Sequence, residues 1–274
     1  MDTTLWIINA LLPLLYLGAV GAYGLSFFAD HAAARRGSRP LLLLALAGHL
    51  AYLTLLTLRW QQFPAATVSQ AVSALAFAVA LVYLLVEGYG RSRATGVWLL
   101  SVALLFELLA ALLRSTAPPH FERFESPLFA VHVSLALIGY AGFVVAACYG
   151  FLFLRVYHDL KNASFSTFFG TLPPLEVLDR MMAGALGCGF AALAGAVASG
   201  AVWAERFFPQ GWQSDPKVLI TLATLAFYGV VLALRASGRL RGRPIAWASL
   251  AGFAALLFSL LAVNLFLSRL HGFR

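Results

Sequence analysis

Long apolar runs are the feature that most constrains how this chain can fold. Hydrophobic residues make up 61% of the sequence and charged residues only 11%, and the apolar residues gather in continuous stretches of about 20 residues, which suits helices crossing a bilayer core of about 30 Å. The segments of a membrane barrel would be shorter and would alternate in polarity. The sequence therefore predicts an all-α integral membrane protein, a single polytopic domain over residues 1–274 with a bundle of about eight transmembrane helices. The predicted spans are Leu5–Phe28, Pro40–Leu58, Thr67–Glu87, Gly96–Leu113, Pro127–Leu154, Met181–Trp203, Pro216–Leu234 and Pro244–Leu267.

The basic residues predict an orientation. They are denser in the loops after the first, third, fifth and seventh spans, as in Arg35-Arg36 and in Arg241 and Arg243. Because basic residues accumulate in cytoplasmic loops, both termini are expected on the outer, extracytoplasmic side. The net charge of +8 then reflects membrane topology and the neighbouring membrane lipid, and no nucleic acid partner is expected. In the long cytoplasmic connection, residues 175–180 follow Pro173-Pro174 and are expected to form a short surface helix before the sixth span.

Two classes of chemistry are excluded by missing motifs. The two cysteines, Cys148 and Cys188, are far apart, and the chain has no Cys-x-x-Cys or Cys-x-x-Cys-His motif. The usual dithiol reductase site and a covalent haem attachment site of the chain's own are therefore excluded. Nothing resembles a nucleotide-binding loop, which excludes transport driven by ATP on this chain alone.

A polar and aromatic segment, residues 200–217, separates the sixth and seventh spans. Trp203 and Trp212 lie where membrane proteins place indole rings at the water boundary. Asp215 followed by Pro216 predicts the start of a helix, because Asp caps free N–H groups and Pro loses no hydrogen bond at the first helical position. An ordinary aromatic interfacial loop before a capped helix is the simpler interpretation. One face of a haem site is the alternative.

Two histidines share the predicted outer side with this segment. His132 lies near the outer end of the fifth span and His271 just beyond the eighth. Two imidazoles beside tryptophans suit axial ligation of a haem iron better than a hard cation, which prefers oxygen ligands. Asn264, two helical turns before His271, is positioned to fix its tautomer, and Arg206 or Arg59 to pair with haem propionates. A hydrogen bond from His132 to a neighbouring helix, a lipid headgroup contact for His271 and an interhelical bond for Asn264 are the alternatives.

His49 and Glu107 lie at nearly the same depth in the second and fourth spans. His49 is about 14 Å from the cytoplasmic end at the helical rise of about 1.5 Å per residue. Because an ionisable side chain at mid-membrane is costly, it usually faces a partner or a cavity. We expect the two residues to pair. Such a pair could pass protons, support a buried haem or simply join two helices.

Short motifs from Pro127 to the C-terminus together resemble a known family, the cytochrome c assembly membrane proteins of CcsA/ResC and HemX-like type. Each motif is weak alone, and their order and spacing carry the resemblance over about half of the chain. They are His132-Val133 with Gly139-Tyr140-Ala141, Leu172-Pro173-Pro174-Leu175-Glu176, Ser199-Gly200-Ala201-Val202-Trp203-Ala204, Asp215-Pro216-Lys217, Arg241-Gly242-Arg243, Val263-Asn264-Leu265 and Leu270-His271-Gly272-Phe273.

The resemblance implies a function. In that family an outer tryptophan-rich segment flanked by two histidines holds haem for attachment to apocytochrome c. His132 and His271 match the flanking ligands of the haem iron, and Trp203 with residues 212–217 matches the tryptophan-rich region. The implied cofactor is haem b. The implied partners are apocytochrome c, a partner membrane protein of cytochrome c assembly and an external thiol reductant, and the implied location is the bacterial inner membrane.

The chain also departs from the family pattern. The family's assembly enzymes end the segment Trp-x-Trp-Asp-Pro-Lys-Glu, whereas here Ser214 replaces one Trp and Val218 replaces Glu. Ala233 stands where those enzymes place an intramembrane histidine, so a second, buried haem site of the usual kind is not expected. The short chain resembles the HemX-like branch. Part of a cytochrome c synthase, a non-catalytic regulator or assembly subunit of a larger membrane complex, and a small-molecule transporter all stay open.

Overall fold

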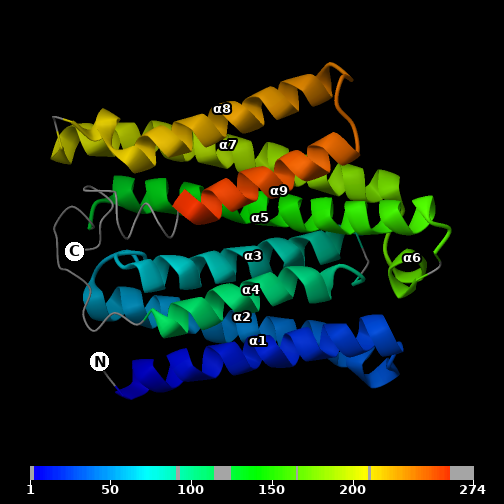
Figure 1. Cartoon of the computed structure of the whole chain (residues 1–274). Helices are drawn as coiled ribbons and strands as arrows, with labels where there is room; N and C mark the ends of the chain where they lie inside the picture. Colours follow the sequence, from blue (N-terminus) through cyan, green and yellow to red (C-terminus); the bar gives the residue numbers. More distant parts are fainter. Residues whose placement is uncertain (1–2, 91–92, 114–124, 165, 209–210, 260–274) are drawn as a thin grey trace. The chain divides into compact units, whose positions relative to one another are not determined.

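The computed structural model describes residues 3–90, 93–113, 125–164, 166–208 and 211–259. In these ranges the chain is helical and contains no strand, which agrees with the predicted all-α class (Figure 1). The chain divides into two compact units. Unit 1 comprises residues 1–120 with 170–172, and unit 2 comprises residues 121–169 with 173–274.

In the residues that the structure describes, unit 1 contains four long helices that pack in a closed ring. α1 contacts α2 and α4, and α3 contacts the same two helices (Figure 1). Gly96 at the start of α4 makes one close approach possible, because a Cβ there would collide with the ring of Tyr23 and the hydroxyl of Tyr83. The helices are α1 (Thr3–Ala29), α2 (Ala32–Trp60), α3 (Val68–Gly90) and α4 (Gly96–Leu112).

Unit 2 is organised around the long helix α5, which packs along α7 and α9 (Figure 1). α5 and α7 approach closely at glycines: a Cβ on Gly142 would lie 2.7 Å from the Cα of Gly189. Small residues allow such contact between membrane helices. The elements are α5 (Pro127–Lys161), α7 (Leu175–Phe207), the 3₁₀ turn η2 (Trp212–Ser214), α8 (Pro216–Ala236) and α9 (Arg243–Phe258), with the five-residue α6 (Thr167–Thr171) between α5 and α7.

An ion pair joins three helix ends in unit 2. Asp179 near the start of α7 accepts two hydrogen bonds from Arg235 near the end of α8, at 3.0 and 2.7 Å. The same carboxylate accepts a bond from the backbone N–H of Gly242, just before α9, at 3.1 Å. One aspartate thereby fixes where α7, α8 and α9 meet.

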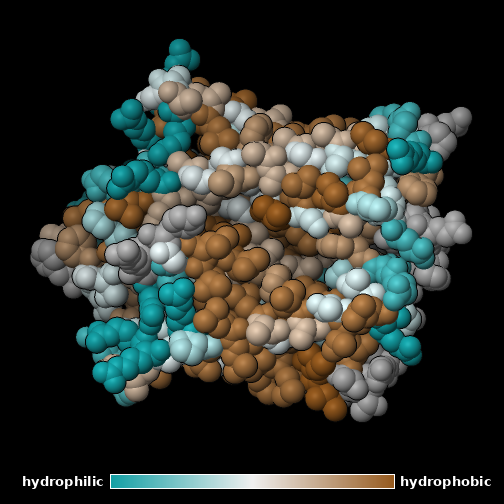
Figure 2. Space-filling model, turned by 180° about the vertical axis from the view of Figure 1, so that it is seen from behind, coloured by the Kyte–Doolittle hydropathy of each residue, from teal (hydrophilic) through white to brown (hydrophobic). Residues whose placement is uncertain are grey.

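Six helices in the described ranges are long and apolar enough to cross a membrane. Much of their side surface is apolar, and hydrophilic residues gather toward helix ends (Figure 2). The other two apolar helices, Gly96–Leu112 and Arg243–Phe258, are shorter. Of the eight predicted spans, six therefore correspond to helices long enough to cross the membrane. The predicted end of the last span, Leu267, lies outside the described residues. The placement of both termini on the outer side stays a prediction.

Three predicted boundaries differ from the structure, one of them the end of α5, which continues past the predicted Leu154 to Lys161. α2 begins at Ala32, ahead of the predicted start at Pro40, because Pro40 is accommodated inside the helix. The expected short surface helix after Pro173-Pro174 is also absent, since Leu175 begins α7, which continues without a break to Phe207. Pro174 is the N-cap of that helix, so the prolines precede one long helix instead of two.

Candidate functional site

His132 lies in the second turn of α5, where this helix packs against α7. Its Nδ1 lies 2.8 Å from the carbonyl oxygen of Ala196 on α7. Because a carbonyl only accepts, Nδ1 carries a proton. Metal-ligating histidines commonly donate their other ring nitrogen to a backbone carbonyl in this way, which fixes the tautomer and the ring orientation. The same bond also joins the two helices, which is the structural alternative that the sequence left open.

Gly200 makes room for the imidazole. A Cβ at this position would lie 2.5 Å from His132 Nδ1 and 2.6 Å from its Cε1, so a larger residue would displace the ring. In the sequence, Gly200 was noted only as part of a motif, so this role was not predicted. The available signal was a glycine one turn before Trp203, on the same predicted outer side as His132.

Trp203 forms an apolar wall beside His132. The two rings are parallel within 3°, with centroids 6.4 Å apart. The indole is 6% exposed and packs against Phe129 of α5 at 5.3 Å and against Phe207 and Phe208 at 5.7 and 5.8 Å. Phe129 lies one turn from His132 on the same helix, so the aromatic cluster and the imidazole form one surface built from α5 and α7.

Trp212, Asp215 and Arg206 lie in the connection from α7 to α8. The Trp212 Nε1–H donates to Glu205 Oε2 at 3.0 Å, which ties η2 to the end of α7. Asp215 is the N-cap of α8 and accepts from the backbone N–H of Lys217 at 2.9 Å, and Pro216 is the first helical residue. The predicted helix start is therefore confirmed. Arg206 is exposed in the last turn of α7.

The structure describes only some of the other proposed haem-site residues. His271 and Asn264 lie outside the described residues, so their roles stay predictions. Arg59 is exposed in the last turn of α2, in unit 1. Of the two proposed haem ligands, His132 is thus the one whose surroundings lie in the described part of the chain.

The structure also brings His49 and Glu107 together, inside unit 1. His49 Nε2 lies 3.8 Å from Glu107 Oε2, and Ser73 Oγ lies between them, at 3.0 Å from His49 Nε2 and 2.9 Å from Glu107 Oε2. The Tyr16 hydroxyl lies 3.0 Å from His49 Nδ1. Each of the four helices of unit 1 contributes one residue to this chain, which we call the buried tetrad. Sequence depth alone indicated His49 and Glu107 and gave no sign of Tyr16 and Ser73.

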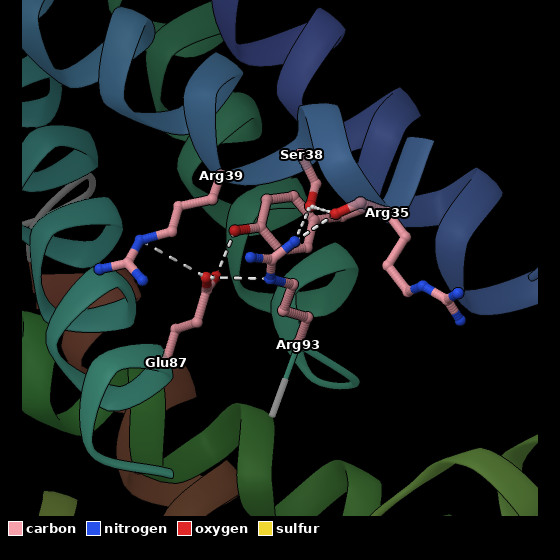
Figure 3. Close-up of polar contacts among 6 residues, drawn as sticks. Arg35, Ser38, Arg39, Glu87 and Arg93 are labelled. Atoms are coloured by element: carbon pink, nitrogen blue, oxygen red, sulfur yellow. Dashed lines mark hydrogen bonds and ion pairs between the residues drawn. The ribbon is translucent and has the colours of Figure 1, made fainter. Parts of the chain in front are cut away.

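A second polar cluster in unit 1 was not anticipated. Glu87 near the end of α3 is 4% exposed and accepts a hydrogen bond from Tyr23. It pairs with Arg93 at 3.3 Å and Arg39 at 3.9 Å (Figure 3). Arg93 also donates to the carbonyl oxygen of Arg35, whose guanidinium points away from Glu87 (Figure 3). The cluster joins α1, α2, α3 and the loop before α4 at one end of unit 1.

Comparison with known proteins supports the resemblance found in the sequence. Residues 38–271 match the cytochrome C assembly protein family, so the match begins well before Pro127. A cytochrome c biogenesis protein CcsA of Microcystis aeruginosa is 26% identical over 276 residues, covering 82% of this chain and 84% of the relative. The CcsA protein of Prochlorococcus marinus strain NATL1A is 27% identical over 251 residues, covering 80% and 79%. That of Chlamydomonas reinhardtii is 26% identical over 244 residues, covering 82% and 65%. The chain belongs to the cytochrome c assembly protein family and is of the CcsA type.

Proposed function

We propose that this protein takes part in cytochrome c biogenesis by holding haem for presentation to apocytochrome c. His132 would hold the haem iron together with His271, the second ligand that the sequence predicts. Family membership and the names of the CcsA relatives support the role in biogenesis. The positive-inside rule supports the outer side of a bacterial inner membrane as the location of the site.

The surroundings of His132 carry the proposal. Its Nδ1 proton is held by the Ala196 carbonyl, so we propose that a metal would be ligated through Nε2, as in sites where the other ring nitrogen donates to a backbone carbonyl. Gly200 is the residue that permits this ring position. An imidazole with a fixed tautomer beside a wall of aromatic rings fits an axial ligand of haem, whose iron is commonly held by histidine.

Neighbouring residues would bind and orient the group. Haem b would supply the iron and the vinyl groups that thiolates of the apocytochrome attack. Trp203 and Phe129 would exclude water from one side of His132, and the exposed guanidinium of Arg206 would pair with a propionate. Asp215 holds the start of α8, and Trp212 holds η2 against α7, so both act by shaping the connection. A partner membrane protein and an external thiol reductant would complete the reaction.

Absorption spectra of the purified protein test the proposal. Wild type, His132→Ala, His271→Ala and His158→Ala would be compared in oxidised and reduced form, before and after haem is added. His158 is the matched control, because it lies on the same helix, is exposed and contacts Asn162. We expect reducible Soret and α bands in wild type and His158→Ala and their loss in the other two variants. Bands of equal intensity in all four proteins would contradict the proposal.

A non-catalytic regulator or assembly subunit is the second candidate. Both tryptophans of the signature already contact protein groups, Trp203 in the aromatic cluster and Trp212 with Glu205. Ser214 and Ala233, which replace a tryptophan and a histidine of the family's enzymes, are both exposed. A wild-type protein that stays colourless after haem is added would favour this candidate.

A further inference from the structure

The buried tetrad crosses the interior of unit 1 as a continuous series of hydrogen-bonding atoms. Tyr16, His49 and Glu107 are 0% exposed and Ser73 is 2% exposed. The series runs from the Tyr16 hydroxyl through both ring nitrogens of His49 and the Ser73 hydroxyl to Glu107 Oε2. We propose that the buried tetrad is a proton-transfer site, in which Ser73 relays one proton between Glu107 and His49. The family role of the chain does not assign this site, and the proposal does not depend on haem binding at His132.

The geometry decides between the chemical roles that the sequence left open for His49. Both ring nitrogens lie 3.0 Å from hydroxyl oxygens. The ring is also enclosed by aromatic neighbours, with Phe77 at 5.3 Å and Tyr16 at 5.7 Å between centroids. Ligation of a haem iron needs a ring nitrogen that is not already hydrogen-bonded and space for a porphyrin beside it. The surroundings of His49 therefore suit proton transfer better than a buried haem.

One arrangement of the protons places the transferable proton on Glu107. The carboxyl Oε2–H then donates to Ser73 Oγ, the Ser73 hydroxyl donates to His49 Nε2, and His49 Nδ1–H donates to the Tyr16 oxygen. Every observed contact is used, and all groups are neutral. Neutral groups suit a buried site because an isolated ionised carboxylate is costly there.

The other arrangement places the proton on His49. Glu107 Oε2–H breaks and its proton goes to Ser73 Oγ, while the hydroxyl proton of Ser73 goes to His49 Nε2. The products are a carboxylate and an imidazolium 3.8 Å apart, with Ser73 donating to the carboxylate. Atoms and charge balance without any co-reactant, and the same positions of the heavy atoms satisfy the bonds of both arrangements. Proton transfer therefore requires no rotation of the His49 ring.

The second oxygen of Glu107 favours the neutral arrangement at rest. In the part of the chain that the structure describes, Glu107 Oε1 is buried and has no hydrogen-bond partner. An unpaired carbonyl oxygen of a neutral carboxyl costs less than an unpaired carboxylate oxygen. Glu107 is therefore the resting site of the proton, and His49 receives it when the surroundings change.

The groups that face His49 define what else takes part. α1 contributes Tyr16, α4 contributes Glu107, and α3 contributes Ser73 and Phe77. From α2 itself the ring of Tyr52 lies 6.3 Å away. Among the residues that the structure describes, the ionisable groups at the site are thus two tyrosines and one carboxyl besides the imidazole. Chains of histidine and acidic side chains inside a membrane protein commonly mark proton relays.

Infrared spectroscopy of the full-length protein in lipid nanodiscs tests the proposal without haem. We expect wild type to show a protonated-carboxyl C=O band that shifts in D₂O and disappears in Glu107→Gln. In Ser73→Ala the band should move to higher frequency, because the carboxyl loses its hydrogen bond. Ser249→Ala is the matched control, since Ser249 is also fully buried but donates to Ile245 of its own helix, and its band should equal that of wild type.

Nitrogen NMR of labelled histidine supplies a second measurement. Because one proton is shared at constant pH, any fall of the Glu107 carboxyl band with temperature should be matched by a rise in the imidazolium fraction of His49 in wild type, and this coupling should be lost in Ser73→Ala. A wild type without the Glu107 carboxyl band at any pH would overturn the proposal. So would an unchanged band in Ser73→Ala. Each variant must show a cooperative thermal unfolding transition, so that a change in its spectra is not caused by misfolding. A wild-type protein without haem absorption bands would contradict the haem proposal and leave this proposal unaffected.

Discussion

Replacing Gly200 by alanine tests the packing that orients His132. The new Cβ would lie 2.5 Å from His132 Nδ1, closer than side-chain atoms can approach, so the imidazole must move and its bond to Ala196 is lost. A neutral hydrogen bond contributes about 0.5–1.5 kcal/mol, and overpacking costs typically about 1–3 kcal/mol. We therefore expect the free energy of unfolding to fall by roughly 2–4 kcal/mol.

The same substitution should weaken haem binding. Loss of the group that orients a ligating histidine typically lowers affinity for the metal by about 10–100-fold. We expect a decrease of that order in a haem titration followed by the Soret band of Gly200→Ala. Thermal unfolding in detergent would be measured on the same samples.

Gly187→Ala is the control for both measurements. Gly187 lies on the same helix, and a Cβ there would meet nothing within 4 Å. Alanine in an unobstructed helix interior should leave haem affinity unchanged and stabilise the protein by about 0.4–1 kcal/mol. If Gly200→Ala binds haem like Gly187→Ala and is equally stable, the packing of His132 on Gly200 does not matter and the argument is wrong.

Three further predictions concern stability and can be checked by thermal or denaturant unfolding in detergent. Asp215→Ala should lose about 0.5–2 kcal/mol through loss of the helix cap, and Asp215→Asn should retain most of the stability; equal losses in both would argue against capping. Glu87→Gln removes the buried partner of Arg39 and Arg93, which are themselves partly exposed, and should cost about 1–3 kcal/mol, whereas Asp30→Asn, in a mostly exposed pair, should change little; similar values for the two would show that burial of Glu87 is unimportant. Asp179→Asn breaks the paired bonds to Arg235 and should destabilise unit 2 more than Glu176→Gln in the exposed first turn of the same helix; the reverse order would show that the junction is unimportant.

Apolar length and local helix signals predicted much of the fold. Six runs became long helices, and Asp215-Pro216 began α8 because capping depends only on adjacent residues. The start of α7 could not be predicted in the same way. Pro174 is compatible with a break between two helices or with the start of one, and packing of α7 along α5 decides for one continuous helix.

The candidate sites show a similar limit. The pairing of His49 and Glu107 was predicted from their similar depth in the membrane. That depth follows from the orientation given by the basic loops and from the helical rise per residue. Ser73 and Tyr16 were not predicted, since hydroxyl residues are common in membrane helices and their partners depend on which helices are neighbours. Gly200 was equally hidden, because the value of a glycine depends on the side chain that faces it from another helix.

Imidazole rescue of His132→Gly tests the central claim most directly. The purified variant would be titrated with haem in the absence and presence of free imidazole, with wild type and His158→Gly measured alongside. If His132 is an axial ligand, the variant should lose the wild-type reduced spectrum and regain it when imidazole fills the space left by the side chain. An unaltered spectrum in His132→Gly without imidazole would contradict the account.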